Sequence, residues 1–98
     1  MAWQVRFLEA SYDFYQKILD LPPAAKFILY ILDVKRCLNR TEIIRETLLP
    51  KRTVGSALIL LTENGFVEKI KGKDLQKLER NYRRRIDYRE VYYQIRSF

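Results

Sequence analysis

The amino-acid sequence predicts one α+β domain that is mainly α-helical. A chain of 98 residues fits a single domain, and 48% hydrophobic with 13% aromatic residues is enough for a modest core. Apolar residues recur at three- and four-residue steps through four segments, as they do in amphipathic helices. Two later segments, "FVEKIK" and "EVYYQIR", are rich in β-branched and aromatic residues with partial alternation, which predicts strands.

The first predicted helix extends from Trp3 to Leu19 and has an unusually wide apolar face. Its large apolar residues at helical spacing are Phe7, Leu8, Tyr12, Phe14, Tyr15, Ile18 and Leu19. The sequence "LPP" ends this helix, and Pro23 is suited to the first turn of a second helix that continues to about Lys35. Because "KFILYILDV" is apolar nearly all round, this second helix is expected at the centre of the domain.

A very short strand is expected at Cys37 and Leu38, followed by a third helix from Arg40 to about Leu48. Asn39 and Glu42 have the spacing of a capping box, in which the Asn side chain accepts from the N3 amide and the Glu side chain accepts from the N-cap amide. The expected inward-facing residues of this helix are Ile43, Ile44 and Leu48.

After "LLPK", a fourth helix is predicted from about Lys51 to Asn64. Gly65 can adopt the left-handed conformation at C′, and a Schellman ending would pack Phe66 at C″ on Leu61 at C3.

The two C-terminal strands should pair as an antiparallel hairpin around a long connection. A short helix capped by Asp74 would place Leu75, Leu78, Tyr82 and Ile86 on one face, whereas an extended ribbon would reach further at about 3.3 Å per residue. The ribbon is slightly favoured. Helices, a helix-turn-helix and then a hairpin are the order of a winged helix-turn-helix with an N-terminal helix and a long basic β-wing. The expected parts are residues 1–21 (N-terminal helix), 22–65 (three-helix core) and 66–98 (β-wing).

Composition narrows the function. Nineteen Lys and Arg against twelve Asp and Glu give a formal charge of +7, which favours a polyanionic partner. With no His and one Cys, Cys37, neither a metal site nor a disulfide framework is expected. No phosphate-binding loop or nucleophile motif is present, so we expect no enzyme and no cofactor, and no small-molecule effector is evident. A targeting segment and a membrane span are also not expected, which favours a cytoplasmic protein.

The segment "LNRTEIIRETLLPKRTVGSALILLTENGFVEKI", Leu38 to Ile70, resembles the winged helix-turn-helix of MarR-, ArsR- and PadR-like transcriptional regulators, including small archaeal or archaeal-viral relatives. The matching motifs are "TEII", "RTVGSAL" and "LLTENGFVEKI". The resemblance implies that Lys51 to Leu60 enters the major groove of double-stranded DNA. The residues that it places at DNA-contact positions are Pro50, Lys51, Arg52, Thr53, Gly55 and Ser56.

Within that set, Arg52 could pair with guanine O6 and N7, Thr53 could contact a phosphate or a thymine methyl, and Lys51 could contact phosphate. The alternative is that Lys51 and Arg52 only solvate the start of the helix.

Two features depart from the family pattern. Gly55 and Ser56 stand where relatives often have Ser and Arg, and close approach of the backbone to DNA would explain the glycine. Ile59 and Leu60 replace charged residues, and packing against protein is favoured over contact with thymine methyls.

The expected wing contains most of the positive charge. From Lys69 to Glu90 there are nine cations and four acids, a net charge of +5, whereas Met1 to Leu21 has two cations and three acids, a net charge of −1. The wing residues expected to contact DNA are Lys71, Lys73, Lys77, Arg80, Arg83, Arg84, Arg85 and Arg89. The alternative for "YRRRIDYR" is a solubilising surface segment.

The apolar face of the first helix exceeds what one small domain should need, which predicts a homodimer. Its expected interface residues are Phe7, Leu8, Phe14, Tyr15 and Ile18, although the whole face could also serve one monomer's core. We therefore expect a dimeric, sequence-specific DNA-binding transcriptional regulator. The alternatives are a winged helix used for protein interaction or assembly, with Ile59 and Leu60 as the docking patch, and a nonspecific nucleoid protein.

Overall fold

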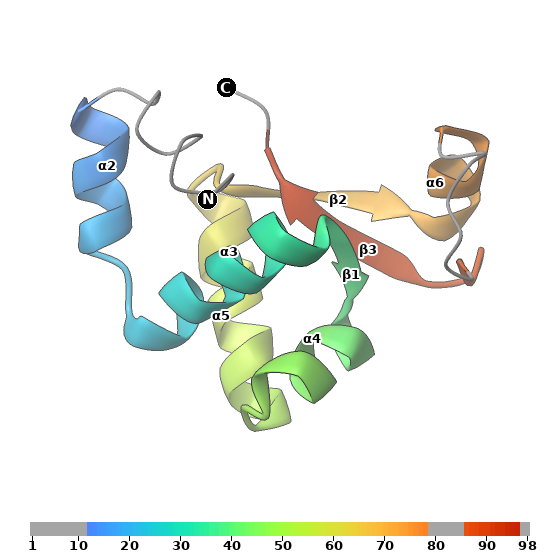
Figure 1. The fold of residues 1–98 in the computed structure, drawn as a ribbon, viewed down its shortest axis with the longest axis horizontal. Helices are drawn as coiled ribbons and strands as arrows, with labels where there is room; N and C mark the ends of the chain where they lie inside the picture. The colour runs from blue at the N-terminus through green and yellow to red at the C-terminus, as the bar shows by residue number, and fades with distance from the viewer. Residues whose placement is uncertain (1–11, 79–85, 97–98) are drawn as a thin grey trace.

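The computed structural model describes residues 12–78 and 86–96 (Figure 1). The predicted α+β class with mainly helical content is confirmed. In chain order the elements are α2 (Tyr12–Leu19), α3 (Pro23–Lys35), β1 (Cys37–Asn39), α4 (Arg40–Thr47), α5 (Lys51–Glu63), β2 (Val67–Lys71), α6 (Gly72–Leu78) and β3 (Val91–Ile95). The bounds of α3 agree with the prediction, and the first predicted helix is described only from Tyr12 onward.

The three strands form one antiparallel sheet in the order β1-β3-β2. Leu38 lies opposite Tyr93, and Val67 lies opposite Ile95, so these four residues share one face of the sheet. They belong to the main core together with the helices. Cys37, Ile70 and Tyr92 lie on the opposite face and belong to a second, smaller cluster. The small sheet is therefore apolar on both faces.

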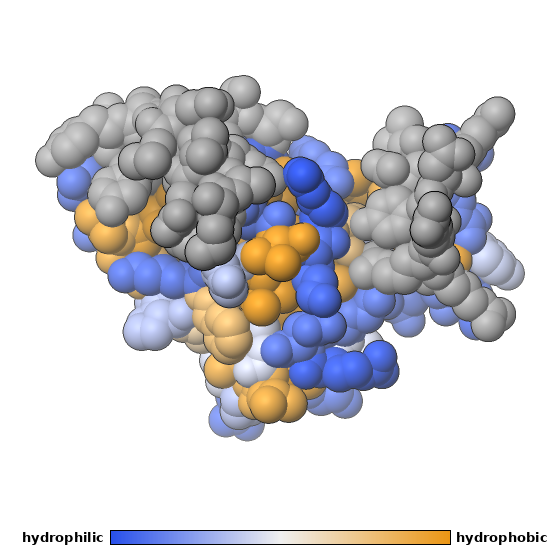
Figure 2. All heavy atoms as spheres, in the orientation of Figure 1, coloured by the Kyte–Doolittle hydropathy of each residue, from blue (hydrophilic) through white to orange (hydrophobic). Residues whose placement is uncertain are grey.

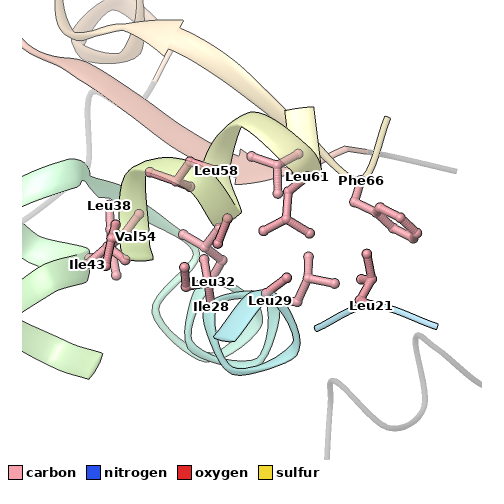
Figure 3. Close-up of a cluster of buried hydrophobic side chains, with 13 residues drawn as sticks. Leu21, Ile28, Leu29, Leu32, Leu38, Ile43, Val54, Leu58, Leu61 and Phe66 are labelled. Atoms are coloured by element: carbon pink, nitrogen blue, oxygen red, sulfur yellow. The ribbon is translucent and has the colours of Figure 1, made fainter. Parts of the chain in front are cut away.

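The main core lies between α3 and α5, as Figure 3 shows. Ile28 and Leu32 of α3 point toward Val54 and Leu61 of α5, and Ile43 of α4 closes one end. All five side chains are at most 1% exposed, and burial of an aliphatic side chain of this size contributes about 1.5–3 kcal/mol. The expected central position of α3 is confirmed.

Both ends of α4 are defined by local hydrogen bonds. The predicted capping box is present: the Glu42 amide donates to Asn39 Oδ1 over 2.8 Å, and the Asn39 amide donates to Glu42 Oε1 over 2.9 Å. The expected inward position of Leu48 is wrong. Because α4 ends at Thr47, Leu48 adopts the left-handed conformation at φ 59° and is 87% exposed.

Thr47 is buried beside this turn instead, and its hydroxyl donates to the Ile43 carbonyl over 2.7 Å. Ile43 is buried and Ile44 packs at the edge of the main core, as expected.

The end of α5 is the predicted Schellman motif. Gly65 has φ 77°, the Phe66 amide donates to the Leu61 carbonyl over 3.0 Å, and the Gly65 amide donates to the Thr62 carbonyl over 3.2 Å. Phe66 and Leu61 are both buried in the main core. This ending turns the chain directly into β2.

The favoured extended ribbon between β2 and β3 is wrong for residues 72–78, which form α6. Leu75 of α6 and the nearby Ile86 are buried against Cys37 and Tyr92, and the Gln76 side chain donates to the Ile86 carbonyl over 2.7 Å. An extended ribbon would leave this face of the sheet in water, whereas α6 covers it. Asp74 lies within the first turn of α6, which begins at Gly72. The Leu78 side chain and Tyr82 lie outside the described residues.

Gly72 is the point at which α6 meets the start of β3. Its amide donates to the Glu90 carbonyl over 2.8 Å, and a Cβ at this position would overlap the backbone carbonyl oxygen of Asp87. The Asp87 carbonyl oxygen also accepts a hydrogen bond from the Glu90 amide over 3.1 Å, so it cannot move aside as the end of a flexible side chain can. The position therefore requires glycine.

We predict that Gly72→Ala lowers the free energy of unfolding by about 1–3 kcal/mol, because the added methyl group displaces the turn before β3. Urea unfolding followed by circular dichroism measures the change. The matched control is Lys73→Ala at the neighbouring exposed position, which should change stability by no more than about 0.5 kcal/mol. Equal stability of Gly72→Ala and the wild type would contradict the packing described here.

Candidate nucleic-acid interface

One face of α5 is exposed, and its position is fixed by the burial of the opposite face. Val54, Ala57, Leu58 and Leu61 are buried, whereas Arg52, Ser56, Ile59 and Glu63 are exposed at helical spacing. We call these four exposed residues the α5 stripe. It begins with a cation near the N-terminus of the helix and ends with an acid near the C-terminus.

A groove of about 550 Å³ lies along the α5 stripe and reaches the sheet. Its charged lining comes from three elements: Arg52 and Glu63 of α5, Arg40 of α4 and Lys69 of β2, a net charge of +2 from three cations and one acid. Ile59 and Tyr93 add apolar surface. We call this feature the α5 groove. Its positive charge and its mixture of apolar and polar side chains suit a polyanionic ligand with flat or methylated surfaces.

Gly55 is covered by an arginine from another helix. A Cβ at Gly55 would lie 2.5 Å from Arg40 Nη2, and the same Nη2 donates to the Lys51 carbonyl over 3.4 Å. Close approach of a DNA backbone was the expected reason for this glycine. The structure gives a second reason, because the space that Gly55 leaves is occupied by the Arg40 side chain.

The residues of the predicted recognition set differ in their surroundings. Arg52, Gly55 and Ser56 line the α5 groove together. Lys51 and Pro50 are exposed but do not line it, and Pro50 is the N-cap residue without a side-chain cap hydrogen bond. Thr53 is half-buried. The structure thus brings three of the six predicted residues into one groove.

Two side chains of the α5 groove, Arg40 and Lys69, were missed as DNA-contact candidates. Arg40 was assigned only to the start of the third helix, and Lys69 was counted in the wing charge without a contact role. Nothing in the local sequence near Arg40 indicates that it reaches α5, because Gly55 lies 15 positions later in the chain.

The predicted wing residues are only partly described. Lys71, Lys73, Lys77 and Arg89 are exposed, whereas Arg80, Arg83, Arg84 and Arg85 lie outside the described residues. Arg89 Nε lies 3.4 Å from Asp87 Oδ1, and the guanidinium lies 5.9 Å from the centroid of the Tyr88 ring. This exposed ion pair partly neutralises Arg89, although such pairs contribute little in water.

Arg89 also lines a second shallow groove of about 390 Å³, between the start of α4 and residues 86–89. Arg45 and Arg89 face Glu42 and Asp87 there, so the charges of this groove balance. The α5 groove is the more positive of the two.

Ile59 and Leu60 have different environments although they are adjacent. Leu60 is half-buried against the main core, as the favoured interpretation expected. Ile59 is 61% exposed, so its expected packing against the protein's own core is wrong. Successive helical residues point about 100° apart, which places Leu60 over the core and Ile59 on the α5 stripe.

Other exposed apolar side chains do not line the α5 groove. Figure 2 shows apolar atoms at the lower end of the molecule, over the turn between α4 and α5, where Leu48 is exposed. Phe27, Tyr30 and Val34 form an exposed row on α3. Of the residues expected at a dimer interface, Ile18 packs at the edge of the protein's own core. Phe7, Leu8 and the side chains of Phe14 and Tyr15 lie outside the described part of the structure.

Within residues 12–78 and 86–96, no group of His, Cys, Asp and Glu side chains could hold a metal ion. In the same part of the chain, no helix is long and apolar enough to cross a membrane. No family model, curated protein or solved structure matches this chain. The α5 groove is therefore a candidate site because of its geometry and its charge alone.

We predict that Leu60→Ala destabilises the protein more than Ile59→Ala does. Leu60→Ala should lower the free energy of unfolding by about 1–2 kcal/mol, less than the 2–5 kcal/mol typical of a fully buried leucine, because Leu60 is half-buried. Ile59→Ala should change it by about 0.5 kcal/mol or less, since the side chain is exposed. Urea unfolding of both variants makes the comparison. A larger loss for Ile59→Ala than for Leu60→Ala would show that the two environments are exchanged.

Proposed function

We propose that this chain is a winged helix-turn-helix protein that binds double-stranded DNA in a sequence-specific manner as a dimeric transcriptional regulator. The observation that supports this most strongly is the α5 groove, in which an exposed helix face lies beside cations from three different elements. The order α3, β1, α4, α5, β2, β3 and the sheet order β1-β3-β2 match the layout of a winged helix. No cofactor and no enzymatic activity are part of the proposal.

In this proposal α5 enters the major groove, which is wide enough to admit an α-helix. The α5 stripe faces the base edges, with Arg52 nearest the N-terminus of the helix and able to bond guanine O6 and N7 through its planar guanidinium. Lys69 and the cations of the wing contact backbone phosphates on either side. Because residues 72–78 form α6 against the sheet, Lys73 and Lys77 lie on this helix and not on an extended arm.

The direct test is a salt titration of binding, measured by fluorescence anisotropy with duplexes of random and of selected sequence. We expect log K to fall linearly with log salt, with a steep negative slope for both duplexes and tighter binding to the selected one. Arg52→Ala should reduce the difference between the two duplexes, with a cost of about 1–3 kcal/mol at one base pair. Lys26→Ala on the exposed face of α3 is the matched control and should leave the difference in affinity between the two duplexes unchanged. Affinity that does not depend on salt would rule out the proposal.

A second candidate function is a protein-interaction or assembly module, which the exposure of Ile59 and Leu48 favours. In such a module both side chains would fill a pocket of a protein partner and DNA would not bind. Ile59 distinguishes the two candidates because it lies in the middle of the α5 stripe. On DNA, its closest chemical match is the C5-methyl group of thymine.

We predict that replacing thymine by deoxyuridine in the selected duplex weakens binding of the wild type at one or more positions, by about 1 kcal/mol per lost methyl contact. Ile59→Ala should bind the two duplexes equally, since its side chain no longer reaches the methyl group. Anisotropy titrations with both proteins and both duplexes give the four affinities. An equal loss on deoxyuridine in the wild type and in Ile59→Ala would remove Ile59 from the base contacts.

The proposed dimer should be visible in the full-length chain. We expect sedimentation velocity to show dimers at micromolar concentration, because the sequence of the predicted N-terminal helix has more large apolar residues than one small domain should need. Deletion of residues 1–11 should yield monomers or insoluble protein. Phe27→Ser on the exposed row of α3 is a control for the alternative surface. A full-length chain that sediments as a monomer would contradict the dimer, and dissociation by Phe27→Ser alone would move the interface to α3.

A further inference from the structure

We propose that Arg40, which belongs to α4, contacts a phosphate of the DNA strand beside α5, and that Gly55 is the residue that positions it. This inference rests on the proposed DNA-binding function. In this inference, a side chain of α4 contacts DNA next to the exposed face of α5.

The position of the Arg40 guanidinium is the first line of support. Arg40 is the first residue of α4, directly after the Asn39 cap, so its backbone is held by the capping box. Its side chain crosses to the first turn of α5, where Nη2 lies 3.4 Å from the Lys51 carbonyl oxygen. The guanidinium therefore lies beside the N-terminal half of α5, the part of a recognition helix that comes nearest to DNA.

The second line of support is the unused hydrogen-bonding capacity of this group. A guanidinium has five N–H donors, and the long bond to Lys51 uses only one. No described carboxylate forms an ion pair with Arg40, and the residue is exposed on the wall of the α5 groove. Its neighbours in the groove include the cations Arg52 and Lys69, so an anion is the complementary partner. A phosphate can accept two parallel N–H bonds from such a fork.

The third line of support is the glycine itself. Glycine in the interior of a helix lowers stability relative to alanine, so its presence in the second turn of α5 calls for a steric reason. The structure supplies one, because a methyl group at position 55 would lie 2.5 Å from Nη2 and 3.2 Å from Cζ of Arg40. Alanine would fit only if the guanidinium moved away. The helix thereby gains a cation that its own sequence does not provide at positions 55 and 56.

The test measures affinity and salt slope for a random-sequence duplex by fluorescence anisotropy, with the full chain. Arg40→Ala should lower the magnitude of the slope by about 0.9, the value for one phosphate contact, and weaken binding roughly five- to tenfold near 0.1 M salt. Arg40→Gln keeps most of the aliphatic stem and should show the same change, which guards against an effect of lost packing. Arg40→Lys keeps the charge and should retain most of the slope. Lys26→Ala is the control for the loss of one positive charge elsewhere.

Gly55→Ala tests the positioning role. It should reproduce the loss of slope in the wild-type background and add nothing in the Arg40→Ala background, because its effect is transmitted only through Arg40. Additive losses would overturn the role of Gly55, and an unchanged slope in both Arg40→Ala and Arg40→Gln would overturn the phosphate contact. If the wild type itself shows no salt-dependent binding, the proposed function fails together with this inference. Wild-type binding without a contribution from Arg40 overturns the inference alone.

Discussion

The packing of α3 against α5 is the contact on which the rest of the molecule depends. Ile28 and Leu32 meet Val54 and Leu61 in a core from which water is excluded (Figure 3). Because the buried residues of α5 recur at three- and four-residue steps, burial of one face determines which residues form the other. The exposed α5 stripe is thus a consequence of the core. The same packing brings the N-terminus of α4 close enough for Arg40 to cross α5.

The sheet adds a second constraint, since three short strands cannot bury both of their faces on their own. The helices cover the face with Leu38 and Tyr93, whereas α6 and Ile86 cover the face with Cys37 and Tyr92. The Tyr92 hydroxyl accepts a hydrogen bond from the Asp87 amide over 2.9 Å, which ties the turn before β3 to the sheet. The described cations of this end of the molecule, Lys71, Lys73, Lys77 and Arg89, are exposed to water. The basic end of the molecule therefore has its own small hydrophobic core.

Features governed by near neighbours in the chain could be predicted from sequence. The capping box at Asn39 and Glu42 and the Schellman ending at Gly65 depend on residues within five positions of one another, and both are present as expected. The bounds of α3 follow in the same way from Pro23 and the long apolar segment. Apolar character alone did not predict burial at helix ends and surfaces. Leu48 is exposed because α4 ends one residue earlier than predicted. Ile59 is exposed because successive helical residues point about 100° apart, so that Leu60 faces the core and Ile59 does not.

Tertiary contacts account for what sequence could not provide. The choice between a ribbon and a helix at residues 72–78 depended on the apolar far face of the sheet, whose residues come from three separate segments. The crossing of Arg40 over Gly55 joins two helices across a turn, and neither residue has a local signal for it. Half of the predicted recognition residues line the α5 groove. These residues were predicted from the resemblance to known regulators and not from their charge alone.

The most direct measurement of the proposed DNA-binding face is a set of NMR spectra of the ¹⁵N-labelled full-length chain, recorded during titration with duplex DNA. We expect amide and side-chain shift changes at five residues that line the α5 groove: Arg40, Arg52, Ser56, Ile59 and Lys69. Amides of Phe27 and Val34, on the exposed row of α3, should remain unchanged. Shift changes confined to α3, or spread evenly over the exposed cations with no concentration on α5, would contradict the account.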